Sequence, residues 1–159
     1  MGMQLNQATD YAFRAVLHLA QAPPGAVISA QALAVEEAIP PRFLLKIMRA
    51  LTQAGLVASH RGVEGGYSLA KAADAISLLD IIAAMEGPVA IHRCLAEREA
   101  CNKHCQEECP VHATLGRLQK QLVAGLKQAT VASLLAEKRA AASCERHGPG
   151  GIKKPERNV

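Results

Sequence analysis

The sequence predicts a mainly α-helical chain, organised as a winged helix-turn-helix with a long C-terminal dimerisation helix. Apolar residues recur at helical spacing in successive segments between Thr9 and Ala54, which are separated by turns containing proline and glycine. Two short strand-like runs then enclose a glycine-rich tip, the pattern of a β-hairpin. Finally, an apolar stripe runs from His112 to about Ala129. The 159 residues suffice for one such domain and an extension.

The first two predicted helices are separated by a Pro-Pro-Gly turn. Residues 9–21 repeat apolar side chains on one face, and Asp10 falls in the first turn, where exposed amides favour a carboxylate. Ser29 is a suitable N-cap for a second helix that ends at Glu36 or Glu37. An Ile-Pro-Pro connection follows, and its second proline suits the first turn of the next helix.

The third predicted helix, Arg42–Ala54, carries different residues on its two sides. One side is apolar and consists of Phe43, Leu44, Ile47, Leu51 and Ala54. The other side has no acid and consists of Arg42, Lys46, Arg49 and Gln53. In a helix-turn-helix, such a second helix lies in the major groove of duplex DNA. The alternative is an ordinary solvated charged face.

A hairpin directly after this helix favours the DNA interpretation. Leu56–Ala58 and Tyr67–Leu69 are the two predicted strands, and residues 60–66 form the glycine-rich tip. Arg61 lies on this tip, where it can enter a minor groove or grip a phosphate, and His60 lies beside it. A helix-turn-helix followed by such a hairpin is a winged helix.

The wing is followed by a predicted helix over residues 77–86. Ser77 and Asp80 form a variant of the capping box at its start, and Gly87-Pro88 closes it. The long helix that begins at His112 is amphipathic. Because a small domain cannot hide so long a stripe, we expect it to pair with a second copy of the chain, with packing on the first helix as the alternative.

The segment between these helices concentrates cysteine. Its pattern is C-x6-C-x3-C-x3-C-x2-H, formed by Cys94, Cys101, Cys105, Cys109 and His112. Without a secretory signal, thiols at this density indicate a soft metal or a redox response. The spacing departs from the two tight pairs of a zinc ribbon, whereas an iron–sulfur cluster accepts thiolates from an irregular loop. An iron–sulfur cluster is therefore expected, with zinc, a cluster-free thiol redox switch or inert thiols as alternatives.

Composition and charge exclude several other classes. No apolar run is long enough to span a membrane and no signal sequence is visible, so we expect a cytoplasmic protein without a membrane partner. Two Phe, two Tyr and no Trp count against an aromatic platform for unpaired bases. Cys109 and His112 could act as nucleophile and base, but the sequence offers no oxyanion donors, and no enzymatic activity is expected.

The expected organisation has four parts. These are a winged helix-turn-helix over 1–87, a cysteine-rich cluster-binding loop over 88–111, the dimerisation helix and a short following helix over 112–139, and a disordered basic tail over 140–159. From Lys138 onward there are six Lys/Arg and two acids, a balance equal to the net charge of +4 of the whole chain. Net charge therefore says nothing about DNA binding by the rest of the chain, where only the arrangement of charges is informative.

Three stretches together resemble the bacterial regulators related to IscR, NsrR and RirA. They are L-N-Q-A-T-D-Y-A-F-R-A-V-L-H-L-A near the start, R-G-V-E-G-G-Y-S-L in the wing, and the cysteine segment before the long helix. The resemblance covers residues 3–138. It implies a homodimeric transcriptional regulator, expected to be a repressor, that binds double-stranded operator DNA. It also implies sensing of iron–sulfur status, nitric oxide, oxygen or iron through a cluster near the dimer helix.

The resemblance also implies roles for individual residues. The family's three cysteine ligands correspond by position to Cys94, Cys101 and Cys109. His112 and Asp10, the latter contributed by the partner subunit, match two alternative positions for a further ligand. Arg61 matches the wing arginine, and residues 42–46 fall on the recognition helix.

Two positions depart from the family pattern. Cys105 is an additional thiol, so the third ligand is either Cys105 or Cys109, and four cysteines of one subunit could complete the ligand set. The cluster type, [4Fe-4S] or [2Fe-2S], stays open. Leu45 stands where IscR often has an acidic or polar residue, and since leucine can meet a thymine methyl, that regulator's operator sequence is not transferred.

Overall fold

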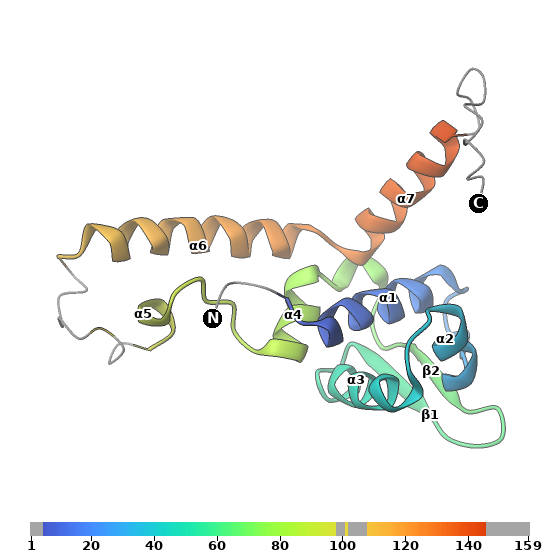
Figure 1. Ribbon diagram of the computed structural model, residues 1–159. Helices are drawn as coiled ribbons and strands as arrows, with labels where there is room; N and C mark the ends of the chain where they lie inside the picture. The colour runs from blue at the N-terminus through green and yellow to red at the C-terminus, as the bar shows by residue number, and fades with distance from the viewer. Residues whose placement is uncertain (1–4, 98–100, 102–107, 146–159) are drawn as a thin grey trace, which may run out of the picture.

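The computed structural model describes residues 5–97, 101 and 108–145, and it confirms a mainly helical winged helix-turn-helix with C-terminal helices (Figure 1). Two strands form the wing: β1 (Val57–His60) and β2 (Gly66–Leu69). The helical elements, in chain order, are α1 (Gln7–Gln21), α2 (Ala30–Glu36), α3 (Pro41–Gln53), the 3-10 turn η1 (Ala73–Ala75), α4 (Leu78–Glu86), α5 (Arg93–Ala96), α6 (Pro110–Gln128) and α7 (Val131–Glu145).

Local signals set the ends of the first three helices. The side chain of Asn6 accepts a hydrogen bond from the backbone N–H of Thr9 at 2.9 Å, so α1 begins slightly before its predicted start. Ser29 caps α2 as predicted, through its Oγ and the N–H of Ala32 at 3.1 Å. After α3, Gly55 adopts a φ of 68°, a left-handed conformation that ends the helix and that glycine adopts readily.

The wing is an antiparallel hairpin that is anchored at its base. Val57 pairs with Leu69 at the base of the hairpin, and His60 with Gly66 near the tip. Ile28 and Tyr67 exchange two backbone hydrogen bonds of 2.9 and 2.8 Å, which join the α1–α2 connection to β2. A Cβ at Gly66 would lie 2.2 Å from the carbonyl oxygen of Ile28, so this close approach requires glycine.

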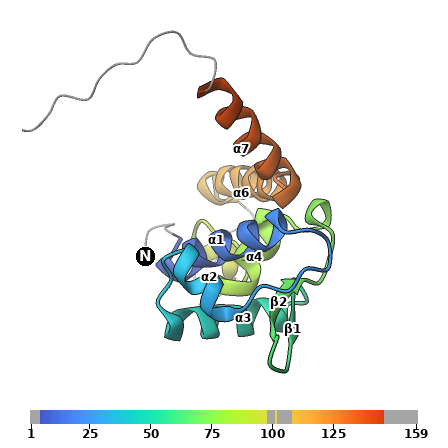
Figure 2. The same cartoon turned by 90° about the vertical axis from the view of Figure 1, so that its right-hand side faces the viewer.

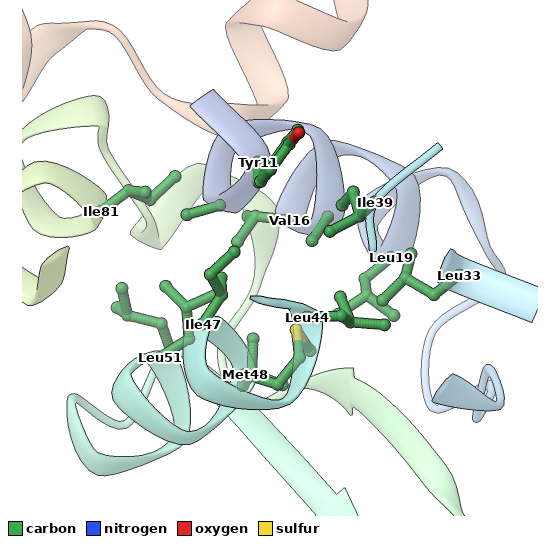
Figure 3. Packing of buried hydrophobic residues seen from close by; sticks show 14 of the residues in the cluster. Tyr11, Val16, Leu19, Leu33, Ile39, Leu44, Ile47, Met48, Leu51 and Ile81 are labelled. Atoms are coloured by element: carbon green, nitrogen blue, oxygen red, sulfur yellow. The ribbon is translucent and has the colours of Figure 1, made fainter. Parts of the chain in front are cut away.

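The inner face of α3 lies at the centre of the hydrophobic core (Figure 3). Leu44, Ile47, Met48 and Leu51 are each no more than 1% exposed. Phe43, predicted on this face, is instead 50% exposed and packs edge-on against Tyr11. Residue 48 is aligned with 44, 47 and 51 on a helix of 3.6 residues per turn, so Met48 rather than Phe43 completes the inner face.

The C-terminal helices are fastened to the winged helix through the start of α4. The predicted capping box is present: the N–H of Asp80 donates to Ser77 Oγ, and the N–H of Ser77 donates to the Asp80 carboxylate. Beside this cap, the N–H of Val131 donates to the carbonyl oxygen of Ile76 at 2.8 Å. Val131 and Leu135 are at most 7% exposed, so the start of α7 belongs to the core.

α7 is longer than the short helix that the sequence predicts. It ends at Glu145 rather than Arg139, so it includes the first residues of the stretch expected to be a tail. Residues 146–159, the rest of that stretch, lie outside the described residues. Within the described part of the chain, no helix is long and apolar enough to cross a membrane.

Candidate nucleic-acid interface and cysteine site

The outer face of α3 presents the residues predicted to contact DNA. Arg42, Lys46, Arg49 and Gln53 are all exposed, and they alternate along the helix with the four buried residues of the core. None of the four forms an ion pair or a side-chain hydrogen bond with another residue that the structure describes. Three cations and an amide donor are therefore available to a ligand with many acceptors, such as a phosphate backbone with base edges.

The wing tip lies at the same edge of the molecule as α3. Two views at right angles show α3 and the β1–β2 tip at one edge, with α6 and α7 at the opposite one (Figures 1 and 2). Arg61 is exposed on this tip. His60 is also exposed, but its Nε2 is 2.9 Å from the Oγ of Ser68, so the ring braces the hairpin. Because α3 and the wing tip lie at the same edge, a single large ligand can contact the cations of both.

The cysteine segment meets α6 where that helix begins. Cys94 lies in α5, and its Sγ is 3.3 Å from Nδ1 of His112 in α6. Cys109 is the N-cap of α6, with its Sγ accepting the backbone N–H of His112 at 3.5 Å. Cys94 and His112, which are 18 positions apart in the sequence, are therefore in contact. Cys94, Cys101 and Cys109 are half-buried thiols.

A second histidine contacts Cys94 and was not among the predicted site residues. Nδ1 of His92 is 3.1 Å from the Cys94 Sγ and also accepts the backbone N–H of Cys94 as the N-cap of α5. The H-x-C spacing is the sequence signal that could have identified it. The sequence analysis predicts no helix in this loop. In the structure, His92 is the N-cap of α5 and therefore lies beside Cys94.

The donor chemistry of this site suits iron or a soft metal, since thiolate and imidazole are their preferred protein ligands. Within residues 5–97, 101 and 108–145, however, no three metal-binding side chains already converge on one point. Cys105, a candidate third or fourth ligand, lies outside the described residues. The described residues therefore supply possible metal ligands at both ends of the cysteine segment. Cys94 lies at the first end, and Cys109 and His112 lie at the second.

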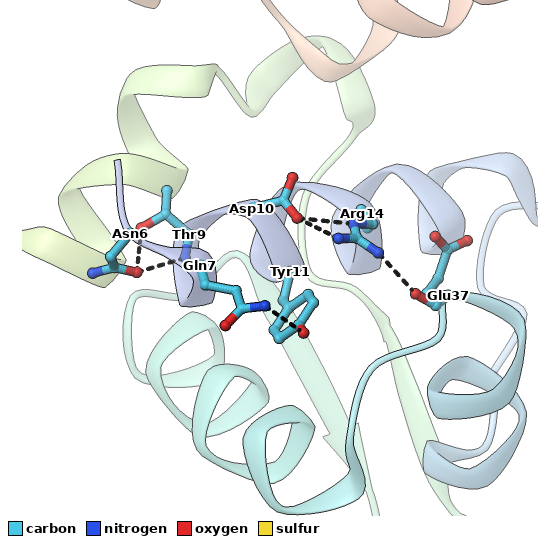
Figure 4. Close-up of polar contacts among 7 residues, drawn as sticks. All are labelled: Asn6, Gln7, Thr9, Asp10, Tyr11, Arg14 and Glu37. Carbon is cyan, nitrogen blue, oxygen red and sulfur yellow. Dashed lines mark hydrogen bonds and ion pairs between the residues drawn. The ribbon is translucent and has the colours of Figure 1, made fainter. Parts of the chain in front are cut away.

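Asp10 is paired with a neighbour on its own helix (Figure 4). Its carboxylate accepts hydrogen bonds from the guanidinium of Arg14, including one of 3.0 Å from Nε, and Arg14 also donates to the carbonyl oxygen of Glu37. The hydrogen bond with Asp10 raises the pKa of Arg14 above its already high usual value. In the described part of one chain, Asp10 forms its side-chain hydrogen bonds with Arg14 and none with Cys94 or Cys109.

These features define a winged-helix transcriptional regulator. The family model Rrf2, described as an iron-dependent transcriptional regulator, matches residues 5–137, and the chain belongs to this family. Because the family consists of regulators rather than enzymes, the alternative of Cys109 as a catalytic nucleophile is excluded.

Similar proteins with curated descriptions match the N-terminal half. The HTH-type transcriptional regulator Rv1287 of Mycobacterium tuberculosis is 42% identical over 88 residues, which cover 55% of this chain and 55% of that protein. The regulator slr0846 of Synechocystis is 43% identical over 84 residues, covering 53% of this chain and 57% of that protein. The chain thus spans about half the length of the curated relatives it matches.

Solved structures share the fold over almost the whole chain. IscR of T. potens has a TM-score of 0.65 and 24% identity, covering 95% of this chain and 96% of that one. CymR, the global cysteine regulator of B. subtilis, has a TM-score of 0.66 and 23% identity, covering 85% and 98%. Regulators with different names therefore share this architecture, and the fold alone does not identify the signal.

Proposed function

We propose that this Rrf2-family regulator is a repressor that binds double-stranded operator DNA and whose affinity is controlled by an iron–sulfur cluster. The signal would be iron–sulfur status, nitric oxide, oxygen or iron itself. The observation that carries the proposal is the contact of Cys94 Sγ with Nδ1 of His112 at 3.3 Å, next to Cys109, which caps the start of α6. Thiols at the start of a long helix are suitably placed for a cofactor to control that helix.

The proposed ligands are the thiolates of Cys94, Cys101 and Cys109. Cys105, His112 or Asp10 of the partner subunit would complete the set. A bound cluster would supply iron that reacts with oxygen or nitric oxide. The chain supplies the ligands, and the half-burial of the three thiols limits the access of water to them.

A second copy of the chain is the proposed partner of α6. This helix has 19 residues, and none of them is buried, although Leu118 and Val111 are large and apolar. Leu118 is 50% exposed and Val111 62% exposed, an arrangement that favours burial in an interface between two copies. A two-fold dimer would set the distance between two α3 helices, which must be about 34 Å to reach successive major grooves.

The hydrogen bonds around α4 provide a route from the cysteine site to the DNA interface. α5 contacts the start of α6, and the end of α6 is joined to α4 by a 2.9 Å bond from the N–H of Leu78 to the carbonyl oxygen of Ala129. α4 packs on α1 and α3. A change in the cysteine segment that tilts α6 would therefore move both winged helices and alter the spacing between the two α3 helices.

Anaerobic purification followed by an absorption spectrum and assays of iron and sulfide tests the cofactor. We expect visible absorption that is lost in the single variants Cys94→Ala, Cys101→Ala and Cys109→Ala. Cys144→Ala, which changes a thiol outside the segment, is the matched control and should keep the colour. Colourless protein that contains zinc would favour the zinc alternative, and metal-free protein after reconstitution would favour a thiol switch.

A further inference from the structure

Leu45 is an exposed apolar side chain at the edge of the cationic face of α3. It is 57% exposed, whereas its neighbour Leu44 is 1% exposed. Arg42 and Arg49 lie three positions before it and four after it, so these two arginines are its neighbours on the helix surface. The core is completed without Leu45, and the exposed side chain has no role in the folding of one chain.

Packing against another helix or strand of the chain does not explain why an apolar residue, Leu45, is exposed at this position. Phe43, the other exposed apolar residue of α3, contacts the ring of Tyr11. Leu45 joins neither that pair nor the partly buried residues packed against the core in the described structure. Its surroundings on α3 are instead the cations that the proposed function places against DNA.

We propose that Leu45 reads the operator by contacting the C5-methyl group of a thymine in each half-site. Thymine is the base that presents an apolar group in the major groove, whereas cytosine presents an amino donor there that a leucine would leave unpaired. Flanking arginines and lysine can hold phosphates or guanines while the apolar side chain enters between them. This inference rests on the proposed binding of DNA through α3, and it is independent of the cofactor.

The test begins with selection of preferred sites from a random duplex library by the full-length protein. Each thymine of the selected site is then replaced by uracil, which removes only the methyl group. We expect one thymine in each half-site at which uracil weakens binding about fourfold, the value for one buried methyl-sized group. Other thymines should show no such loss.

Leu45→Ala should abolish this uracil penalty and reduce the preference for thymine at that position. The substitution is at an exposed site, and a far-UV circular dichroism spectrum checks that the fold is retained. Val35→Ala, at a 74% exposed apolar residue of α2, is the matched control and should keep the full penalty.

The outcomes separate this inference from the function on which it rests. A selected site without any uracil-sensitive thymine, or an undiminished uracil penalty in Leu45→Ala, overturns the role of Leu45 and leaves DNA binding intact. Failure of the wild-type protein to bind any duplex overturns both.

Discussion

Asp80 illustrates how one side chain supports the joint between the winged helix and the C-terminal helices. Its carboxylate accepts hydrogen bonds from the N–H and the hydroxyl of Ser77, at 2.8 and 2.6 Å. The hydrogen bond with Ser77 is the main cause of the lowered pKa of Asp80, and the charges of Lys71 and Lys127 add to it. Next to this cap, α4 is hydrogen-bonded to the connection between α6 and α7.

Asp80→Ala should lower the free energy of unfolding at neutral pH by about 0.3–1.5 kcal/mol, the usual range for one capping contribution. Because the folded-state pKa is lowered, the contribution is present above the ordinary aspartate pKa of about 3.9 and is lost as pH falls through the folded-state value. Urea unfolding at neutral and acidic pH measures both effects. The difference from wild type should shrink on acidification, and Asp74→Ala, an exposed aspartate in η1, should cost much less.

The roles of some individual side chains could be predicted from the sequence. Ser29, Gly55 and the Ser77–Asp80 pair act on backbone groups only a few residues away, so their roles as caps and stops were predictable. The contact of His112 with Cys94 was not predictable in this way, because it joins two elements, α5 and α6, across 18 positions of the sequence.

At the scale of the element, α6 carries the prediction of a dimer. Leu118→Glu should convert a dimer into a folded monomer, because a charge would be buried in the interface while no residue of α6 is buried in one chain. Light scattering coupled to size-exclusion chromatography measures the mass. Val35→Glu introduces the same charge at an exposed site of α2 and should leave the dimer intact. A Leu118→Glu protein that remains dimeric at micromolar concentration would place the interface elsewhere.

The wing carries a second prediction at this scale. Arg61→Ala should weaken operator binding and reduce the slope of the logarithm of affinity against the logarithm of salt concentration by about 0.9, the value for one phosphate contact. Fluorescence anisotropy across a salt series measures the slope. Glu64→Ala changes an exposed acid on the same tip and should not weaken binding. An unchanged slope for Arg61→Ala would show that Arg61 does not contact phosphate.

The arrangement of α6 and the proposed DNA interface in the whole molecule predicts that binding of a cluster changes the affinity for operator DNA by a measurable amount. α6 lies on one side of the winged helix, and α3 with the wing tip, the proposed DNA interface, lies on the other (Figures 1 and 2). Cluster-loaded and cluster-free protein should therefore differ in operator affinity by about 1–3 kcal/mol, or roughly 5- to 150-fold. Anaerobic titrations of one operator at fixed salt concentration measure the difference. Equal affinities would remove control by the cluster and leave a constitutive DNA-binding protein.

The sequence was sufficient to predict the order of the longer helices and the strands, though not α5, together with the glycine-rich wing and the cationic outer face of α3. These features depend on periodicity and on short-range capping, which act within a few residues. Packing in three dimensions was needed to show that Val131 and Leu135 bring α7 into the core. It was also needed to show that His112 contacts Cys94, 18 positions away in the sequence. Each of these outcomes depends on how elements pack against one another, and local spacing does not encode that packing.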